Sequence, residues 1–311
     1  MTAAGASVPQ AAGARLARAR RRHVLRRNAT AYAFLAPGFC AFAVFLLLPV
    51  AWVVRQSFLQ GGVLGASTWV GLDNWREAVG DPALTEALRN TALYAAMVVP
   101  ATVGLGLGLA VLLRGVRRGG AALRTVLYLP SLAPIVLAAL VWVFMVQPDF
   151  GLLNLANRSL GLQPLNLLGD EHLALPTIAG LDIWRGFGFW GILLLAGLLA
   201  VPPELYQAAA LDGASPVRRF WHVTLPAIRP VLAVVALLVT VTSMQVFDSV
   251  YVLTNGGPGG ATRTAVFYIY TSIFETGNPG YGAVLSLILL CVIVVLTFVM
   301  ARVARRLGAS A

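Results

Sequence analysis

The chain alternates between long apolar stretches and shorter polar segments. A helix that crosses the hydrocarbon core of a bilayer needs about 20 mostly apolar residues, because the core is about 30 Å thick and the helix rises about 1.5 Å per residue. The apolar pattern predicts transmembrane helices at about residues 32–56, 90–113, 124–147, 177–201, 228–252 and 281–303. The predicted fold class is an all-α integral membrane protein with six transmembrane helices, in a membrane domain of residues 32–306.

Composition also indicates a membrane protein. Of the 311 residues, 59% are hydrophobic and only 11% are charged, and the mean hydropathy is +0.80. An average soluble domain carries roughly 25% charged residues. The chain is therefore too apolar to be a water-soluble domain or a disordered segment.

Basic residues are distributed unevenly between the two sides that six helices would define. All 23 basic residues are arginines, and 17 of them lie in the segments 1–31, 114–124, 202–229 and 302–306. By the positive-inside rule these segments face the cytoplasm. The protein is then a multi-pass protein of the cytoplasmic membrane with both termini in the cytoplasm, a basic N-terminal tail at 1–31 and a C-terminal tail at 307–311. Because the arginine run near the N-terminus is explained as a topology signal, we expect no nucleic-acid partner.

Several kinds of chemistry lack the residues that they require. Without lysine, the chain has neither a Walker-type nucleotide site nor Schiff-base chemistry. The three histidines lie far apart without ligand spacing, and both cysteines fall in apolar stretches, so we expect neither a metal site nor a disulfide. The spans also lack the paired residues of an intramembrane enzyme. The sequence predicts a protein that is not an enzyme and holds no cofactor of its own.

The predicted cytoplasmic loop 202–228 has a helical pattern of its own. Good helix formers run from Glu204 to Leu211, and Asp212-Gly213 then breaks the helix, with Gly213 free to adopt a positive φ. Ser215-Pro216 restarts a helix, which Leu225-Pro226 is expected to end ahead of the fifth span. Two short helices at an angle either dock into the groove of a partner or rest on the lipid surface. The residues alone leave both interpretations open.

Fixed spacings in this loop carry a family resemblance that favours docking. The pattern Gln207-Ala-Ala-(x2)-Asp-Gly-Ala-(x5)-Phe-(x4)-Leu-Pro-(x3)-Pro230 resembles the EAA loop of ABC importer permeases, which forms a coupling helix in a cleft of the ATPase subunit. The resemblance implies that the loop between helices four and five couples to an ATPase. The coupling residues that it implies are Gln207, Ala208, Asp212, Gly213, Arg218, Arg219 and Phe220. The glutamate that names the motif is Gln207 here, which puts in doubt any interaction that needs a charge at this position.

A second set of motifs narrows the class. The motifs are the glycine-rich run Leu253–Thr262, Tyr268-Ile-Tyr270, Gly280-Tyr281, Val70–Trp75, Asn90-Thr91-(x2)-Tyr94 and Gly151-(x2)-Asn154. Together they resemble carbohydrate-type permeases, in particular the first of their two membrane subunits in the group that serves maltose-like sugars and glycerol 3-phosphate. The resemblance implies a sugar substrate and three kinds of protein partner. These are a second permease subunit, two copies of an ABC ATPase that bind ATP and Mg²⁺, and an extracytoplasmic solute-binding protein.

The predicted fifth span carries the densest set of polar side chains. The substrate-pathway candidates are Thr242, Gln245, Asp248 and Ser249, with Tyr251 as a ring on which a sugar can stack. The four polar residues follow a spacing of three to four, so they share one face of a continuous helix. Their hydroxyl, amide and carboxylate groups suit a sugar. Hydrogen bonding to a helix of a second permease is the alternative interpretation.

Asp182 and Arg185 are predicted to form an i,i+3 ion pair at the outer start of the fourth span, and a role in binding substrate is the alternative interpretation. This placement leaves Asp248 as the single carboxylate expected within the membrane.

The sequence therefore predicts the permease subunit of an ATP-driven, binding-protein-dependent sugar importer that works by alternating access. One alternative is an ABC permease for a non-sugar solute. Another is a secondary transporter driven by an ion gradient, which would need several intramembrane carboxylates or broken helices for its coupling ion.

Overall fold

The computed structural model describes residues 32–61, 67–116, 118–306 and 308. The predicted tails, 1–31 and 307–311, lie outside the described residues apart from Gly308. The chain divides into two compact units, Met1–Gln56 and Ser57–Ala311.

The described part of the first unit is a single helix, Tyr32–Gln56. It contains a π-helical turn, η1 (Ala43–Leu47), followed by α2 (Leu48–Gln56). It ends at Gln56, where the first predicted span also ends.

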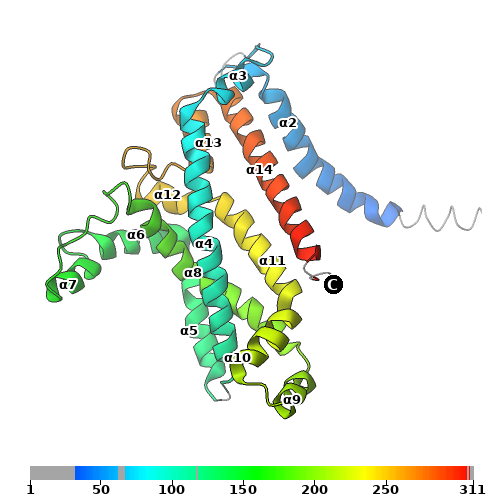
Figure 1. Cartoon of the computed structure of the whole chain (residues 1–311). Coiled ribbons are helices and arrows are strands. Elements are labelled where there is room, and N and C mark those ends of the chain that lie inside the picture. The colour runs from blue at the N-terminus through cyan, green and yellow to red at the C-terminus, as the bar shows by residue number, and fades with distance from the viewer. Residues whose placement is uncertain (1–31, 62–66, 117, 307, 309–311) are drawn as a thin grey trace, which may run out of the picture. The chain divides into compact units, whose positions relative to one another are not determined.

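Four long helices form most of the second unit (Figure 1). They are α4 (Pro82–Arg114), α8 (Ala174–Leu199), α11 (Leu225–Met244) and α14 (Pro279–Arg306). The most extensive packing joins α4 to α8. Glycines permit a close approach, because a Cβ atom on Gly106 would lie 3.1 Å from the backbone nitrogen of Gly191. In lipid, where the hydrophobic effect does not drive helices together, contact between small residues holds them in place.

The third predicted span, 124–147, is not one straight helix. It is divided into α5 (Gly120–Leu132) and α6 (Ile135–Val146), which are bent by 92°. Pro134 explains the break, because the residue before a proline is driven out of the helical region, and Ala133 has extended backbone angles of −67° and 131°. Among the described residues, five helices are long and apolar enough to cross a membrane, and the bent pair would make a sixth.

The loop after α8 has the predicted break but not the predicted end. α9 (Pro203–Leu211) stops at Asp212, Gly213 has φ +71°, and Ser215 caps α10 (Pro216–Arg219) by accepting from the Arg218 amide at 3.3 Å. The expectation that Leu225-Pro226 ends this second helix is wrong. α10 continues through a π-helical turn, η2 (Phe220–Thr224), into α11. The wider π turn accommodates Pro226, which lacks the amide hydrogen that a regular helical turn needs.

The fifth predicted span, 228–252, is also broken. α11 ends at Met244, and the short helix α12 (Asp248–Leu253) begins after a turn. Phe247, with φ −140° and ψ −58°, lies outside helical geometry. The Thr264 hydroxyl donates to the carbonyl oxygen of Val246 at 3.1 Å, so a side chain satisfies a backbone group that the break leaves without a helical partner. The prediction that four polar residues share one face of one helix is therefore wrong in its geometry.

Shorter elements complete the second unit. Strands β1 (Leu59–Gln60) and β2 (Thr68–Trp69) pair antiparallel, with Leu59 opposite Trp69. The remaining helices are α3 (Asp73–Val79), α7 (Leu152–Ser159), α13 (Ala265–Tyr270) and the π-helical turn η3 (Thr271–Glu275). Asn74 on α3 donates to the carbonyl oxygens of Ser57 and Leu59 at 3.0 and 2.9 Å, which ties α3 to the strand pair.

Candidate functional site

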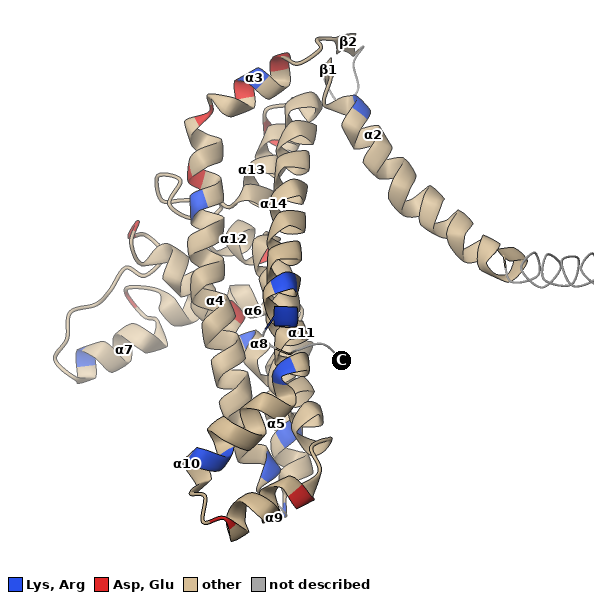
Figure 2. Cartoon of the chain, turned by 45° about the vertical axis from the view of Figure 1, so that its right-hand side comes forward, with Lys and Arg blue, Asp and Glu red and all other residues tan. Residues whose placement is uncertain are grey.

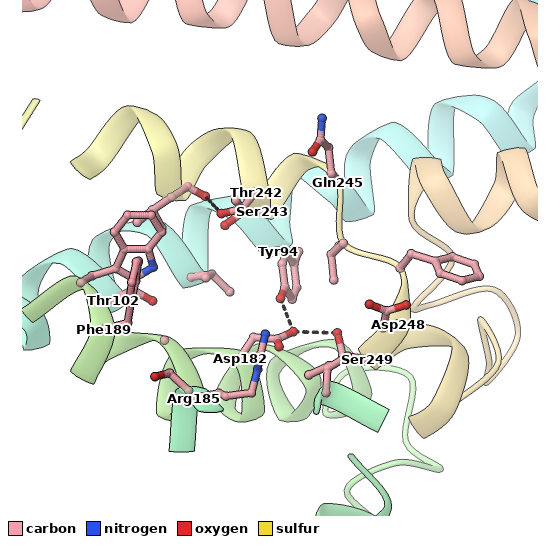
Figure 3. A pocket seen from close by; sticks show the side chains of 18 of the residues that line it. Tyr94, Thr102, Asp182, Arg185, Phe189, Thr242, Ser243, Gln245, Asp248 and Ser249 are labelled. Atoms are coloured by element: carbon pink, nitrogen blue, oxygen red, sulfur yellow. Dashed lines mark hydrogen bonds between the residues drawn. The ribbon is translucent and has the colours of Figure 1, made fainter. Parts of the chain in front are cut away.

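A cavity of about 430 Å³ lies where α4 and α8 face the two broken segments of the chain (Figure 3). Its polar lining consists of Tyr94, Thr102, Tyr128, Ser131, Asp182, Arg185, Thr242, Ser243, Gln245, Asp248 and Ser249. Phe189, Trp190 and Phe247 add aromatic rings. Because polar side chains are costly in a bilayer, such a concentration indicates a pathway or a contact between helices.

Asp182 on α8 is the centre of the hydrogen bonding in this cavity. The Tyr94 hydroxyl on α4 donates to Oδ2 of Asp182 at 2.5 Å, and the Ser249 hydroxyl on α12 donates to the same oxygen at 2.6 Å. Two hydroxyl groups from distant parts of the sequence thus meet at one carboxylate (Figure 3). The network joins α4, α8 and α12.

The predicted ion pair between Asp182 and Arg185 is wrong, since no ion pair joins them in the described part of the chain. The reason is the position of Asp182. α8 begins at Ala174, which places Asp182 eight residues into the helix, about 12 Å along its axis. At this depth the Tyr94 and Ser249 hydroxyls satisfy the carboxylate. The expectation that Asp248 is the single carboxylate within the membrane is also wrong, because Asp182 lies inside the long apolar helix α8.

The predicted pathway residues fall into two groups. Thr242, Gln245, Asp248 and Ser249 all line the cavity, brought there by the break between α11 and α12. Ser249 is buried and points to Asp182, whereas the other three are exposed. Gln245 points away from the Asp182 network in Figure 3. The Thr242 hydroxyl donates to the backbone of its own helix and keeps its lone pairs available as acceptors.

Tyr251 does not line the cavity but belongs to an aromatic cluster beside it. Its ring stacks on Phe247 with centroids 5.4 Å apart and meets Tyr270 edge-on at 5.4 Å. Phe267 and Phe274 extend the cluster along α13 and η3. Through Phe247, the cluster is continuous with the wall of the cavity.

Sequence reasoning missed Tyr94 and Thr102 as cavity residues, and it gave Arg185 a substrate role only as the alternative to an ion pair. The Thr102 hydroxyl and the Arg185 Nε atom are buried without a hydrogen-bond partner among the described residues. A signal for Tyr94 existed in its motif, but nothing in that motif shows that the side chain turns inward. Arg185 would follow only from knowing that α8 starts well before Asp182.

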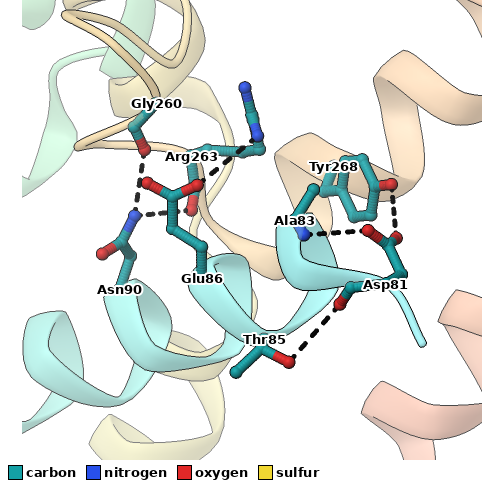
Figure 4. Close-up of polar contacts among 8 residues, drawn as sticks. All are labelled: Asp81, Ala83, Thr85, Glu86, Asn90, Gly260, Arg263 and Tyr268. Atoms are coloured by element: carbon teal, nitrogen blue, oxygen red, sulfur yellow. Dashed lines mark hydrogen bonds and ion pairs between the residues drawn. The ribbon is translucent and has the colours of Figure 1, made fainter. Parts of the chain in front are cut away.

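A second polar cluster lies where α4 begins (Figure 4). Asp81 caps the helix by accepting from the Ala83 amide at 2.8 Å, and its other oxygen accepts from the hydroxyls of Tyr268, at 2.6 Å, and Tyr281. Burial works toward a higher pKa for Asp81, but these donors outweigh it and hold the pKa below its usual value. Burial, together with the hydrogen bond to Asp81, raises the pKa of Tyr268 to about 12.

The motif residues Asn90 and Thr91 on α4 hold the glycine-rich loop in place. Asn90 donates to the carbonyl oxygens of Gly260 and Arg263 at 3.0 and 3.1 Å (Figure 4), and the Thr91 hydroxyl accepts from the Ala265 amide at 2.8 Å. Both side chains are buried and hydrogen-bonded to the loop backbone, so their role is to fix the loop against α4.

The loop residues from Gln207 to Phe220 lie in α9, the turn after it, α10 and the first position of η2, and none of them lines the cavity. Apolar side chains are exposed on this segment: Leu211 is 90% exposed, Val217 68% and Trp221 58%. Tyr206 anchors α9, since its hydroxyl donates to the Thr224 hydroxyl at 3.2 Å and the Arg114 guanidinium lies 3.8 Å from its ring centroid. The segment is thereby attached to the end of α4.

Residues 102–309 match the protein family described as the binding-protein-dependent transport system inner membrane component. The chain belongs to this family. The match covers two thirds of the chain and includes α8, the loop of α9 and α10, and the broken segment around α12. The chain is therefore a multi-pass membrane component of a transport system, and transport rather than catalysis is its class of activity.

Relatives of known function extend the similarity to most of the chain. The trehalose/maltose transport system permease protein MalF of Thermococcus litoralis is 33% identical over 277 residues, which cover 88% of this chain and 93% of that protein. The sulfoquinovosyl glycerol transport system permease protein SmoG of Agrobacterium fabrum is 30% identical over 273 residues, covering 87% and 89%.

A solved structure has the same fold. The crystal structure of a bacterial alginate ABC transporter, in complex with a periplasmic protein bound to an alginate pentasaccharide, contains a chain that matches with a TM-score of 0.80. The two chains are 22% identical, and the match covers 91% of this chain and 96% of that one.

Proposed function

We propose that this chain is one of two membrane-spanning permease subunits of an ATP-driven, binding-protein-dependent importer, and that its cargo is a sugar or a sugar derivative. The observation that carries the proposal is the cavity around Asp182. It combines hydroxyl, carboxylate and guanidinium groups with aromatic rings within a membrane-spanning helix bundle.

The chemistry of the cavity suits a sugar better than an apolar or a simple cationic solute. A sugar presents many hydroxyl groups, each of which both donates and accepts hydrogen bonds. Thr102 and Arg185 place a hydroxyl and a guanidinium in the lining, and Asp248 adds an exposed carboxylate acceptor. The ring of Phe247 in the cavity wall offers an apolar surface to a sugar ring, and Tyr251 lies beside it in the adjoining aromatic cluster. By their names, the two relatives belong to transport systems for trehalose and maltose and for sulfoquinovosyl glycerol, which supports the same class of cargo.

The loop from Gln207 to Phe220 is proposed to dock on an ATPase partner. Its exposed apolar side chains, Leu211, Val217 and Trp221, are unusual for a surface that faces only water. Arg218 and Arg219 add positive charge beside them. Because Tyr206 and Arg114 attach this loop to α4, a movement of the ATPase can reach the helix that carries Tyr94. In this proposal ATP and Mg²⁺ bind to the partner, and this chain holds no cofactor.

The proposed topology places both termini and the α9–α10 loop in the cytoplasm. For the loop and the C-terminal end, Figure 2 supports it, since basic ribbon segments lie at α10 and in the last turns of α14 and acidic segments at α3 and the start of α4. The solute-binding protein would dock at the α3 end. A second permease would complete the pathway at the exposed side chains of Thr242, Gln245 and Asp248.

The test is ATP-dependent uptake by the complete transporter in proteoliposomes, with its binding protein and a panel of radiolabelled sugars. Asp248→Asn should lower uptake of the accepted sugar without preventing assembly of the complex. Asp149→Asn is the matched control, because Asp149 is also exposed but lies outside the cavity. Uptake by Asp248→Asn equal to that of the wild type would refute the role of Asp248. Uptake of no sugar, with transport of another solute, would refute the cargo class.

A further inference from the structure

The helix α7 has its polar face turned toward the chain and its apolar face turned away from it. Asn154 is fully buried, and its amide group donates to the carbonyl oxygens of Gln147 and Leu165 at 3.1 and 2.8 Å, while its oxygen accepts from the Leu165 amide at 2.7 Å. The Arg158 guanidinium, the only charged group of α7, donates to the carbonyl oxygen of Pro148 at 3.1 Å. These contacts satisfy the polar face of α7 within its own segment of the chain.

The opposite face of α7 is apolar and exposed. Leu152 is 63% exposed, Leu155 is 49% exposed, and Leu160, directly after the helix, is 74% exposed. With about 3.6 residues per turn, these leucines lie on the side of the helix opposite Asn154 and Arg158. A contiguous exposed apolar surface marks contact either with a membrane or with another protein.

The position of α7 distinguishes between these two kinds of contact. Figure 1 and Figure 2 both show α7 projecting sideways from the bundle at the level of α8. Because α8 is long and apolar enough to cross the bilayer, the medium beside it, outside the bundle, is lipid. A water-soluble partner would meet the protein beyond the ends of the spans, where α7 does not lie.

The neighbours of α7 also favour lipid over a second permease. α6 is separated from α7 by residues 147–151 alone, and it exposes Leu137, Val141 and Phe144, so exposed apolar side chains run from the bent pair into α7. Both views place α7 on the other side of α4 from α11, the helix that carries Thr242 of the surface proposed for the second permease.

We propose that α7 is a lipid-contacting helix, whose leucines enter the acyl-chain region of the bilayer beside the bundle. Its amphipathic pattern suits the boundary between headgroups and acyl chains, where apolar side chains point into the lipid and polar side chains point away from it. Asn154 binds the backbone on both sides of α7, at Gln147 and Leu165. Contact between α7 and lipid therefore also holds the segment that joins α6 to α8.

The test measures how often nitroxide spin labels collide with oxygen, which concentrates in lipid, and with a water-soluble nickel chelate. The sample is the complete transporter in nanodiscs, without its binding protein. Labels are attached at Leu152→Cys and Leu160→Cys, each in a Cys40→Ser/Cys291→Ser background because both native cysteines are exposed. Both labels should collide mainly with oxygen and report a depth of about 5–10 Å below the headgroup boundary. Val79→Cys is the matched control, since Val79 is an apolar residue that is 91% exposed on α3, and its label should collide mainly with the nickel chelate.

Photolabelling of the wild-type complex with a lipid-soluble carbene reagent gives a result that does not depend on any variant. Labelled peptides from α7 as well as from α6 would support the proposal. Spin labels on α7 that collide mainly with the nickel chelate would overturn it, because α7 would then face water. Spin labels that neither reagent reaches, together with unlabelled α7 peptides, would overturn it in favour of a protein partner. Neither measurement involves cargo, so the result is independent of the proposed sugar transport.

Discussion

At the residue scale, the Asp182 carboxylate determines how the candidate pathway is held together. It accepts hydrogen bonds from Tyr94 and Ser249, which lie 88 and 67 residues away in the sequence. A buried acceptor that loses a donor leaves a polar group without a partner, which costs free energy in lipid as it does in a protein core. The network therefore holds α4, α8 and α12 together and also forms part of the cavity wall.

Tyr94→Phe should destabilise the purified complex by about 1 kcal/mol, because it leaves the Asp182 carboxylate with one donor fewer. The measurement is the apparent melting temperature of the complex in detergent. Tyr128→Phe serves as the control, since the Tyr128 hydroxyl lines the same cavity and makes no hydrogen bond within the described residues. Equal melting temperatures for the two variants would contradict the role given to the Tyr94 hydroxyl.

A second prediction at this scale concerns pH. The pKa of Asp81 is lowered, so its contribution to stability is present above the usual pKa near 4 and is lost as the pH falls through the lower folded-state value. The pKa of Tyr268 is raised to about 12, so its contribution is present below about pH 10 and is lost as the pH rises toward 12.

Asp81→Asn separates these charge effects from helix capping, because asparagine caps helices about as well as aspartate. The difference in melting temperature between wild type and Asp81→Asn should be largest between about pH 5 and pH 9 and should shrink in acid. A difference that does not change with pH would show that the ionised carboxylate contributes nothing beyond the cap.

At the element scale, the sequence predicted where helices occur better than where they break. Apolar length located α4, α8 and α14 to within a few residues, apart from an earlier start for α4, since each is a continuous helix in lipid. Pro134 was visible as a potential break, but a proline in a transmembrane helix is often tolerated, as Pro226 and Pro230 show here. The break at Gln245–Phe247 carries no proline or glycine at all. It depends on contacts such as that of Thr264, which a local pattern cannot reveal.

The candidate site shows the same limit. Thr242, Gln245, Asp248 and Ser249 were identifiable because polar residues are rare in a span, and all four line the cavity. Tyr94 and Asp182 were not identified with them. Their roles depend on the depth of α8 and on a contact between helices that are distant in the sequence. Gly213 was predictable from local chemistry, and its φ of +71° confirms the predicted conformation.

Gly213 also provides a test of the proposed coupling loop. Gly213→Glu should leave the protein in the membrane but uncouple ATP hydrolysis from uptake, since a bulky charged side chain would face the ATPase. Gly161→Glu is a control for backbone strain, because Gly161 has nearly the same φ, +73°, and equally open surroundings. Simultaneous measurement of ATPase activity and sugar uptake distinguishes the outcomes. Normal coupling in Gly213→Glu would refute docking through this loop.

At the scale of the whole molecule, the polar cavity and the apolar loop lie at different places along the same helices. Tyr94 lines the cavity, and Arg114 at the other end of α4 holds Tyr206 of the loop. An allosteric link needs two sites and an element that both of them bias. α4 satisfies the geometric part of that requirement, as expected of one subunit of a larger transport complex.

The most direct test of this account is purification of a tagged copy from its native membrane in mild detergent, followed by identification of the co-purifying proteins by mass. The account predicts a second multi-pass permease and an ATPase with a Walker motif, in a complex that takes up sugar when ATP and a solute-binding protein are supplied. A chain that purifies alone and transports its solute in proteoliposomes without ATP would contradict the account and would favour transport driven by an ion gradient.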